Sequence, residues 1–305
     1  MHASINHHME ETIHTPVLLK EVLEIFNPQP GERYIDATVN GGGHAKEILD
    51  RIGESGLLFG IDRDCALISR LKNKFAVQEN LVAICDSYRE LDHLGITYGF
   101  GEVNGILFDL GFSSYHVDQS GRGFSFLRDE FLDMRFDQEK TDLTAGKIIN
   151  SWSLAELTRI GKEYGEERFA GTIAEAIVRQ RAHRPIETTF ELVRVIKNAI
   201  PLGAQHGRLH PATRMFQALR IAVNDELGEL RIGLEKGIDL LKSGGRMIVI
   251  SFHSLEDRIV KETFRLKEKK GIVQLINKKV LTASNEEIQK NPRARSAKLR
   301  ALMRV

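Results

Sequence analysis

The chain has 305 residues, of which 42% are hydrophobic and 28% charged, and its formal net charge is +1 at pH 7. This composition is typical of a soluble globular protein with one or two domains, and no apolar run approaches the roughly 20 residues of a membrane-spanning helix. The net charge does not indicate nucleic-acid binding and does not exclude it, because such binding depends on a local basic patch.

The chain contains two cysteines, Cys65 and Cys85. They are too few for a disulfide framework or a zinc site, so we expect both to be reduced core residues of a cytoplasmic protein. No group of His, Cys and carboxylate residues has metal-ligand spacing, and we expect no metal. Residues 1–14 lack an apolar stretch, so we expect no signal peptide, and Met9 is a second candidate for the natural start.

Short apolar runs alternate with helical patterns over the first third of the chain. Strands are predicted at 33–38, 56–62, 81–86 and 103–111, and helices at 43–52 and about 64–75. This alternation predicts βαβ units and therefore a doubly wound, mostly parallel α/β sheet of the Rossmann-like kind. The predicted strands end near Asp36, Asp62, Asp86 and Asp109. Because ligands of open α/β sheets lie at the carboxyl ends of the strands, these acids should line one edge.

The middle of the chain has a different pattern. No convincing strand occurs from about 118 to 212, whereas 153–182 and 189–200 have helical spacing. Strand character returns at 244–252, after a long amphipathic segment. We therefore predict two domains: residues 1–117 and 213–305 form the discontinuous sheet domain, and residues 118–212 form an inserted all-helical domain.

The glycine turn after the first predicted strand, "DATVNGGGH" (36–44), is where an α/β protein holds a nucleotide-like cofactor. It lacks both the G-x-G-x-x-G spacing of dinucleotide sites and the G-x-x-x-x-G-K-[ST] pattern of P-loops. Asp62, at the end of the second strand, can accept two hydrogen bonds from a free ribose. Asp36 would repel a pyrophosphate but suits the ammonium and sulfonium of S-adenosylmethionine. The turn alone could be only a tight connection, but with Asp62 and Asp109 it favours a methyltransferase over a nicotinamide-dependent oxidoreductase.

Asp109 and the turn after it, in "ILFDLGFSS", are predicted to lie beside the methyl donor. An exocyclic amine of a base is a poor nucleophile, and a carboxylate that accepts its N–H groups would turn its lone pair toward the methyl group. A role for Asp109 in cofactor binding alone fits the sequence equally well. DNA amine methyltransferases typically carry [SND]-P-P-[YF] after this strand, and the absence of a proline pair here disfavours DNA as the substrate.

Long motifs occur in order along the whole chain. They include "HTPVLLKEV" (14–22), "GGGH" (41–44), "GIDRD" (60–64), "DLGFSS" (109–114), "RGFSF" (122–126), "LDMRFD" (132–137), "YGEERFA" (164–170), "HPATRMFQALRIAVNDEL" (210–227), "ISFHSLEDRIVK" (250–261) and "NPRARSAKLR" (291–300). In these motifs the chain closely resembles the bacterial family that methylates the N4 amine of a decoding-centre cytosine in 16S small-subunit ribosomal RNA. The resemblance implies a class I, S-adenosylmethionine-dependent methyltransferase with a helical insert, acting on a flipped base of 16S rRNA within the small ribosomal subunit. The oligomeric state stays open, a homodimer included.

The same resemblance implies the cofactor-binding residues, which are Gly42, Gly43, His44, Asp62, Tyr88, Asp109 and His116. The chain departs from the family's usual pattern at Asn40, where glycine is usual, and at Tyr88, where phenylalanine is usual. The pair Tyr115–His116 also replaces the usual Pro-Gln. Asn tolerates the left-handed backbone conformation, so we expect the glycine turn to survive. The presence of Asp36, Asp62 and Asp109 argues against a non-catalytic RNA-binding protein that only kept the fold.

Contacts with RNA are predicted mainly in the insert. Five arginines in two short segments suit phosphates as a set, although each one alone also fits a solvated helix face: Arg179, Arg181, Arg184, Arg208 and Arg214. Phe124 fits either a ring that stacks on a base or a core anchor of the insert. Ser251 and His253 follow the last central strand and, with Asp109, are the candidate catalytic residues. Ser254 and Asp257 resemble a capping box at a helix start.

Overall fold

The computed structural model describes residues 16–305 except 112 and 208. The expectations about a signal peptide and about Met9 as a start lie outside the described residues, as does Arg208. Within the described ranges, no helix has both the length and the apolar character needed to cross a membrane.

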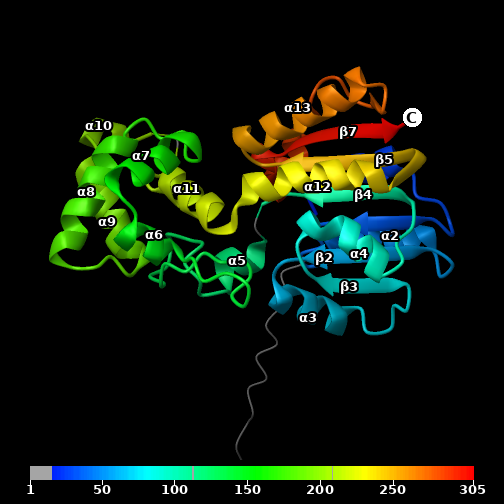
Figure 1. Ribbon diagram of the computed structural model, residues 1–305, viewed down its shortest axis with the longest axis horizontal. Helices are drawn as coiled ribbons and strands as arrows, with labels where there is room; N and C mark the ends of the chain where they lie inside the picture. The colour runs from blue at the N-terminus through cyan, green and yellow to red at the C-terminus, as the bar shows by residue number, and fades with distance from the viewer. Residues whose placement is uncertain (1–15, 112, 208) are drawn as a thin grey trace, which may run out of the picture.

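A seven-stranded sheet forms one half of the molecule (Figure 1), with the strand order β3-β2-β1-β4-β5-β7-β6. The strands are β1 (Arg33–Asp36), β2 (Leu57–Asp62), β3 (Leu81–Cys85), β4 (Val103–Asp109), β5 (Leu241–Ser251), β6 (Val273–Leu275) and β7 (Lys298–Arg304). The first five strands pair in parallel, whereas β7 runs antiparallel to both β5 and β6. The predicted doubly wound, mostly parallel α/β sheet is therefore confirmed.

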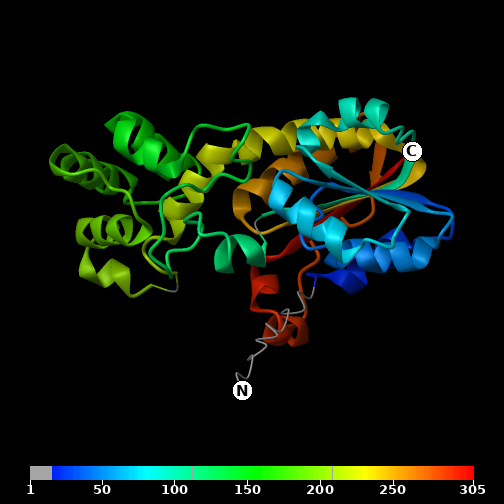
Figure 2. The same ribbon diagram turned by 90° about the horizontal axis from the view of Figure 1, so that it is seen from below.

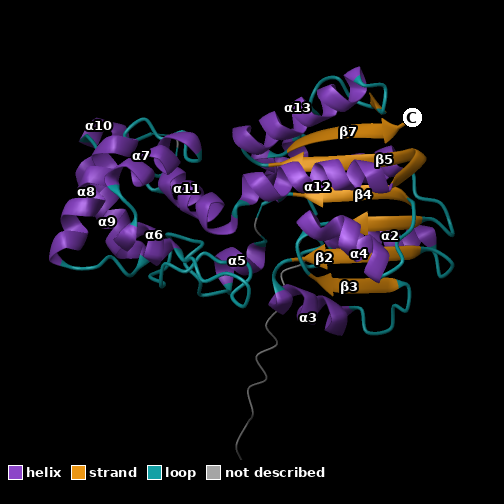
Figure 3. Ribbon diagram, viewed as in Figure 1, coloured by secondary structure: helices purple, strands orange, loops and turns teal. Residues whose placement is uncertain are grey.

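Helices cover both faces of this sheet (Figures 2 and 3). One layer contains α1 (Leu19–Phe26), α2 (Gly43–Ile52) and α3 (Cys65–Lys74), and the opposite layer contains α4 (Leu91–Thr97), α12 (Glu226–Leu240) and α13 (Ser254–Lys269). Alternate residues of β4 enter the two cores, with Ile106 and Phe108 in one and Leu107 in the other. Because side chains of a strand point alternately to the two faces, a strand buried on both faces has a continuous apolar sequence.

Helices and long loops make up the other half of the molecule (Figure 3). They are α6 (Ala145–Ser151), α7 (Leu154–Glu163), α8 (Ala170–His183), α9 (Thr189–Ala199), α10 (Leu202–Gln205) and α11 (Thr213–Asn224), and the short α5 (Ser114–Asp118) leads into them. Capping boxes start α7 at Ser153 with Glu156 and α9 at Thr188 with Glu191. Each box satisfies backbone N–H groups that the first turn of a helix leaves without partners.

The chain passes from this insert back to the sheet domain at Asp225. We expected the sheet domain to resume at 213, but Met215, Phe216 and Leu219 of α11 pack in the core of the insert. Asp225 takes the left-handed conformation, with φ of 48°, and so separates α11 from α12 without a loop. A residue in that conformation ends a helix because its backbone cannot continue the right-handed turn.

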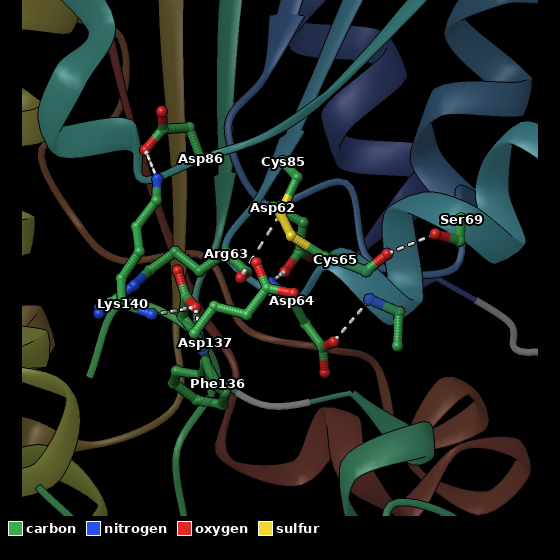
Figure 4. The surroundings of a disulfide bond; sticks show 12 residues. Asp62, Arg63, Asp64, Cys65, Ser69, Cys85, Asp86, Phe136, Asp137 and Lys140 are labelled. Carbon is green, nitrogen blue, oxygen red and sulfur yellow. Dashed lines mark hydrogen bonds and ion pairs between the residues drawn. A yellow bond between two sulfur atoms is a disulfide. The ribbon is translucent and has the colours of Figure 1, made fainter. Parts of the chain in front are cut away.

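Cys65 and Cys85 form a disulfide (Figure 4), so the expectation of two reduced thiols is wrong. Cys65 is the first residue of α3, which follows β2, and Cys85 is the last residue of β3. β2 and β3 are parallel neighbours, and their carboxyl ends therefore meet at the same edge of the sheet. This pairing brings the two Cα atoms to 5.1 Å, which is within the range that a disulfide bridges.

Candidate active site

The glycine turn between β1 and α2 has a backbone that few residues can adopt. Gly42 has φ of +76°, and a Cβ there would lie 2.6 Å from Cδ1 of Leu71 and 2.7 Å from the ring of Phe75. Asn40 also has a positive φ, of 47°, and it is stabilised because its backbone N–H donates to Asp62 (3.0 Å) and its amide to the carbonyl of Thr38 (2.8 Å). The structure thus retains the turn with Asn40 in the usual glycine position.

Three carboxyl groups meet where β1, β2 and β4 end. Burial raises the pKa of Asp36, with a smaller contribution from the charge of Asp62, to about 7. Burial likewise raises the pKa of Asp62 to about 6. The pKa of Asp109 is raised well above its ordinary value, first by burial and then by the charges of Asp36 and Glu256. A positive charge bound here would relieve this repulsion and lower the three pKa values.

The two carboxylate oxygens of Asp109 have different surroundings. Its Oδ2 lies 3.6 Å from Nδ1 of His44, whose Nε2 is 3.0 Å from the carbonyl oxygen of Val17. Its Oδ1 is buried and has no hydrogen-bond partner within the described part of the chain. A buried polar atom without a partner is costly, and such atoms occur where a ligand completes the hydrogen bonding.

A pocket opens at this same edge of the sheet. Its lining includes Ala37, Thr38, Asn40, Asp62, Arg63, Tyr88, Leu110, Gly111, His116, Phe136, Glu226, Leu230 and Glu256. The ring of Tyr88 packs edge-to-face on Phe108, with centroids 5.4 Å apart, and fills the space that a Cβ on Gly233 would occupy. The pocket combines aromatic and aliphatic walls with carboxylates, which is the environment that an adenosine with a free ribose and a cationic tail requires. These residues fit S-adenosylmethionine.

His116 stands in the pocket wall with both ring nitrogens already engaged. Its Nε2 lies 3.0 Å from Oδ2 of Asp64, and its Nδ1 accepts from the backbone N–H of Ser113. Arg122 also donates to Asp64, whose other oxygen caps α3. Burial lowers the pKa of His116 despite the neighbouring carboxylate. His116 therefore joins the segment after β4 to the end of β2 and presents only its ring to the pocket.

Ser251 and His253 lie at the end of β5 but do not line the pocket. The Ser251 hydroxyl lies 3.4 Å from the carbonyl oxygen of Lys298 on the neighbouring strand. His253 caps α13 in a capping box with Glu256, so the predicted box of Ser254 with Asp257 is wrong. Asp257 instead pairs with Arg300 of β7.

Glu226 and Glu256 are pocket residues that the sequence did not single out. Glu226 makes two hydrogen bonds to the buried Arg220, and Glu256 accepts from the backbone of Phe252 and faces His253. Glu226, His253 and Glu256 each have a side-chain atom that could bind a metal ion, and these atoms lie within 4.8 Å of one another. Because Arg220 already neutralises Glu226, a cation would have to displace this pairing. Their position inside two long motifs was the signal that could have found both acids.

The predicted RNA-binding residues of the insert have different environments. Arg181 donates to the carbonyls of Ile149 and Trp152, both at 2.6 Å, and so anchors α8 to the end of α6. Arg184 pairs with Glu191. Phe124 is buried and stacks on Phe136, with centroids 5.2 Å apart, as the core-anchor alternative requires. Arg179 and Arg214 are exposed.

The chain is similar to known proteins along nearly its whole length. A family model described as the MraW methylase family matches residues 11–305. A protein named ribosomal RNA small subunit methyltransferase H from Syntrophotalea carbinolica is 46% identical over 312 residues, covering 96% of this chain and 98% of its own length. A protein of the same name from Geobacter sulfurreducens is 46% identical, and the match covers 94% of this chain and 97% of that protein. One from Symbiobacterium thermophilum is 44% identical, and the match covers 96% of each chain. S-adenosylmethionine, the cofactor predicted from the sequence, is the methyl donor of this family, and the chain belongs to the MraW methylase family.

Proposed function

We propose that the protein transfers the methyl group of S-adenosylmethionine to the exocyclic N4 amine of a decoding-centre cytosine in 16S rRNA, and that it acts on the small ribosomal subunit in the cytoplasm. Its membership of a methylase family and the names of its relatives support an rRNA substrate. The observation that carries the proposal is Asp109, whose buried Oδ1 has no hydrogen-bond partner in the described structure and lies where the parallel strands end.

In this mechanism Asp109 acts on the amine. S-adenosylmethionine, when bound, supplies an electrophilic methyl group. The Asp109 carboxylate accepts an N–H of the cytosine amine, which directs the nitrogen lone pair toward the methyl carbon. The amine nitrogen becomes positively charged as it gains the methyl group, and the Asp109 carboxylate would accept the proton that it then loses. His44, 3.6 Å from the other oxygen, holds the carboxylate in place.

The remaining site residues have binding roles. Asp62 accepts hydrogen bonds from the ribose hydroxyls, Tyr88 lies beside the adenine, and Asp36 faces the ammonium group. The turn at Gly42 and Gly43 lets the backbone approach the cofactor closely. Because an amine inside structured RNA cannot reach the donor, the base must be flipped into the site.

Other candidates serve the site at a distance. His116 holds the segment after β4 against β2, and Ser251 and His253 fix the end of β5, where His253 positions Glu256. The exposed Arg179 and Arg214 contact phosphates, whereas Arg181 is an anchor within the insert.

The test incubates the purified protein with tritium-methyl-labelled S-adenosylmethionine and small subunits from a strain that lacks this activity. Labelled rRNA is digested and its nucleosides are identified by mass spectrometry. We expect N4-methylcytidine at one decoding-centre position. Asp109→Asn should lower kcat by about 10²- to 10⁴-fold, the usual contribution of a proton acceptor. Asp50→Asn, at an exposed position of α2, should behave as the parent protein. Absence of label in RNA despite cofactor binding would refute the proposal.

A further inference from the structure

The insert contains a second recess, separate from the cofactor pocket. It is a groove of about 420 Å³ between α8 and α9, which lie at the end of the insert farthest from the sheet (Figure 1). Its polar lining consists of Arg179, Gln180, His183, Arg184, Arg194, Asn198 and Glu191. The groove therefore has several cationic and amide donors and a single carboxylate.

The positive charge of this groove is only partly neutralised. Glu191 pairs with Arg184 and, as the partner of Thr188 in the capping box of α9, also accepts backbone hydrogen bonds. Arg179 and Arg194 are exposed, and neither has a carboxylate within ion-pair distance in the described ranges. Two guanidinium groups that line one groove without a counter-charge form a site for an anionic ligand.

We propose that this groove binds backbone phosphates of the rRNA substrate at a point remote from the target cytosine. The inference rests on the proposed function for the nature of the substrate. Guanidinium groups bind phosphate oxygens in pairs, and the amides of Gln180 and Asn198 can donate to phosphates or to 2′-hydroxyls. Arg194 was not among the arginines that the sequence pointed to, because its helical segment has no cluster of basic residues.

If the RNA is held both at the active site and at the groove, loss of the groove should have a specific kinetic effect. The groove contributes to binding of the RNA and takes no part in methyl transfer, so its loss should raise KM and leave kcat unchanged. Each phosphate contact displaces counterions, so its loss should also reduce the dependence of binding on salt. The effects should appear with whole small subunits and with protein-free 16S rRNA.

The experiment compares the parent protein with Arg179→Gln/Arg194→Gln in full-length form. Affinity for unmethylated 16S rRNA and for small subunits is measured at 50 to 300 mM potassium chloride, and kcat and KM are measured at saturating S-adenosylmethionine. We expect the slope of log Kd against log salt to decrease by about 1.4 to 1.8 for two lost contacts, and KM to rise about tenfold near 0.15 M salt. Lys147→Gln/Lys162→Gln, which removes two exposed charges from α6 and α7, is the matched control and should change neither.

Other outcomes would overturn the inference. An unchanged slope and KM would show that the groove does not contact RNA. Weaker binding to small subunits with unchanged binding to protein-free rRNA would instead assign the groove to an acidic segment of a ribosomal protein. A lower kcat with an unchanged KM would show that the variant disturbs the active site. Failure of the proposed function is distinct from all of these, because the parent protein would then not methylate RNA at all while the binding measurement still reports on the groove.

Discussion

Replacing Asp36 with asparagine should make the protein without cofactor more stable at alkaline pH. Asp36 is 1% exposed, and burial with the charge of Asp62 raises its pKa from 3.8 to about 7. Between these two values the folded protein retains a proton that the unfolded chain has released. The free energy of unfolding therefore falls as pH rises through this window and is lowest above pH 7.

The magnitude follows from the size of the shift. One pKa unit corresponds to about 1.4 kcal/mol, so a rise of about three units corresponds to about 4 kcal/mol of lost stability once Asp36 is ionised. Asparagine cannot ionise, and its side-chain oxygen can still accept from the backbone N–H of Thr38, which is 3.2 Å from Oδ1 of Asp36. We therefore expect Asp36→Asn to raise the free energy of unfolding by up to about 4 kcal/mol at pH 8 and to have little effect at pH 4.

Urea unfolding of the cofactor-free protein across this pH range measures the effect. Asp50→Asn is the control, because Asp50 is exposed and pairs with Lys46 on the surface of α2. A difference between Asp36→Asn and the parent protein that does not change with pH would refute the reasoning. The same variant should bind S-adenosylmethionine more weakly, since it lacks the charge proposed to face the ammonium group, and calorimetric titration measures that loss.

Three further predictions concern the framework of the site. Reducing the Cys65–Cys85 disulfide, whose sequence separation is 20, should lower the free energy of unfolding by about 3 kcal/mol, measured in urea with and without dithiothreitol. Arg220→Met leaves the buried carboxylate of Glu226 without a counter-charge, so we expect the free energy of unfolding, measured by the same urea method, to fall by about 3 to 5 kcal/mol. Gly42→Ala should cost more stability than Gly53→Ala: both have positive φ, but only a Cβ at Gly42 meets other atoms. If thermal unfolding shows an equal decrease in Tm for the two alanine variants, the predicted steric clash at Gly42 is refuted.

The carboxylate edge was predictable because it follows from local patterns. Asp36, Asp62 and Asp109 each end an apolar run, and parallel strands bring their carboxyl ends to one edge whatever the strand order is. Helices in the middle of the chain were predictable in the same way, since residues 153–182 and 189–200 have helical spacing.

Features that depend on which elements are neighbours were not predictable. The disulfide requires β2 and β3 to be adjacent, and nothing in a 20-residue spacing shows that. The break at Asp225 has no glycine or proline to mark it, so the segment 212–241 reads as one amphipathic helix. His253 caps α13 because the chain turns one residue earlier than the Ser254 pattern suggests, a difference that only the backbone conformation reveals.

The discontinuous sheet determines when the binding site can form during synthesis. β4 pairs with β5, although the whole insert separates them along the chain, and the pocket takes Asp62 from the first segment and Glu226 and Glu256 from the last. A nascent chain therefore exposes the unpaired edge of β4 until the insert and β5 have left the ribosome, and long-range strand pairing of this kind is slow. The lining of the pocket is therefore complete only after the first turn of α13 has been made.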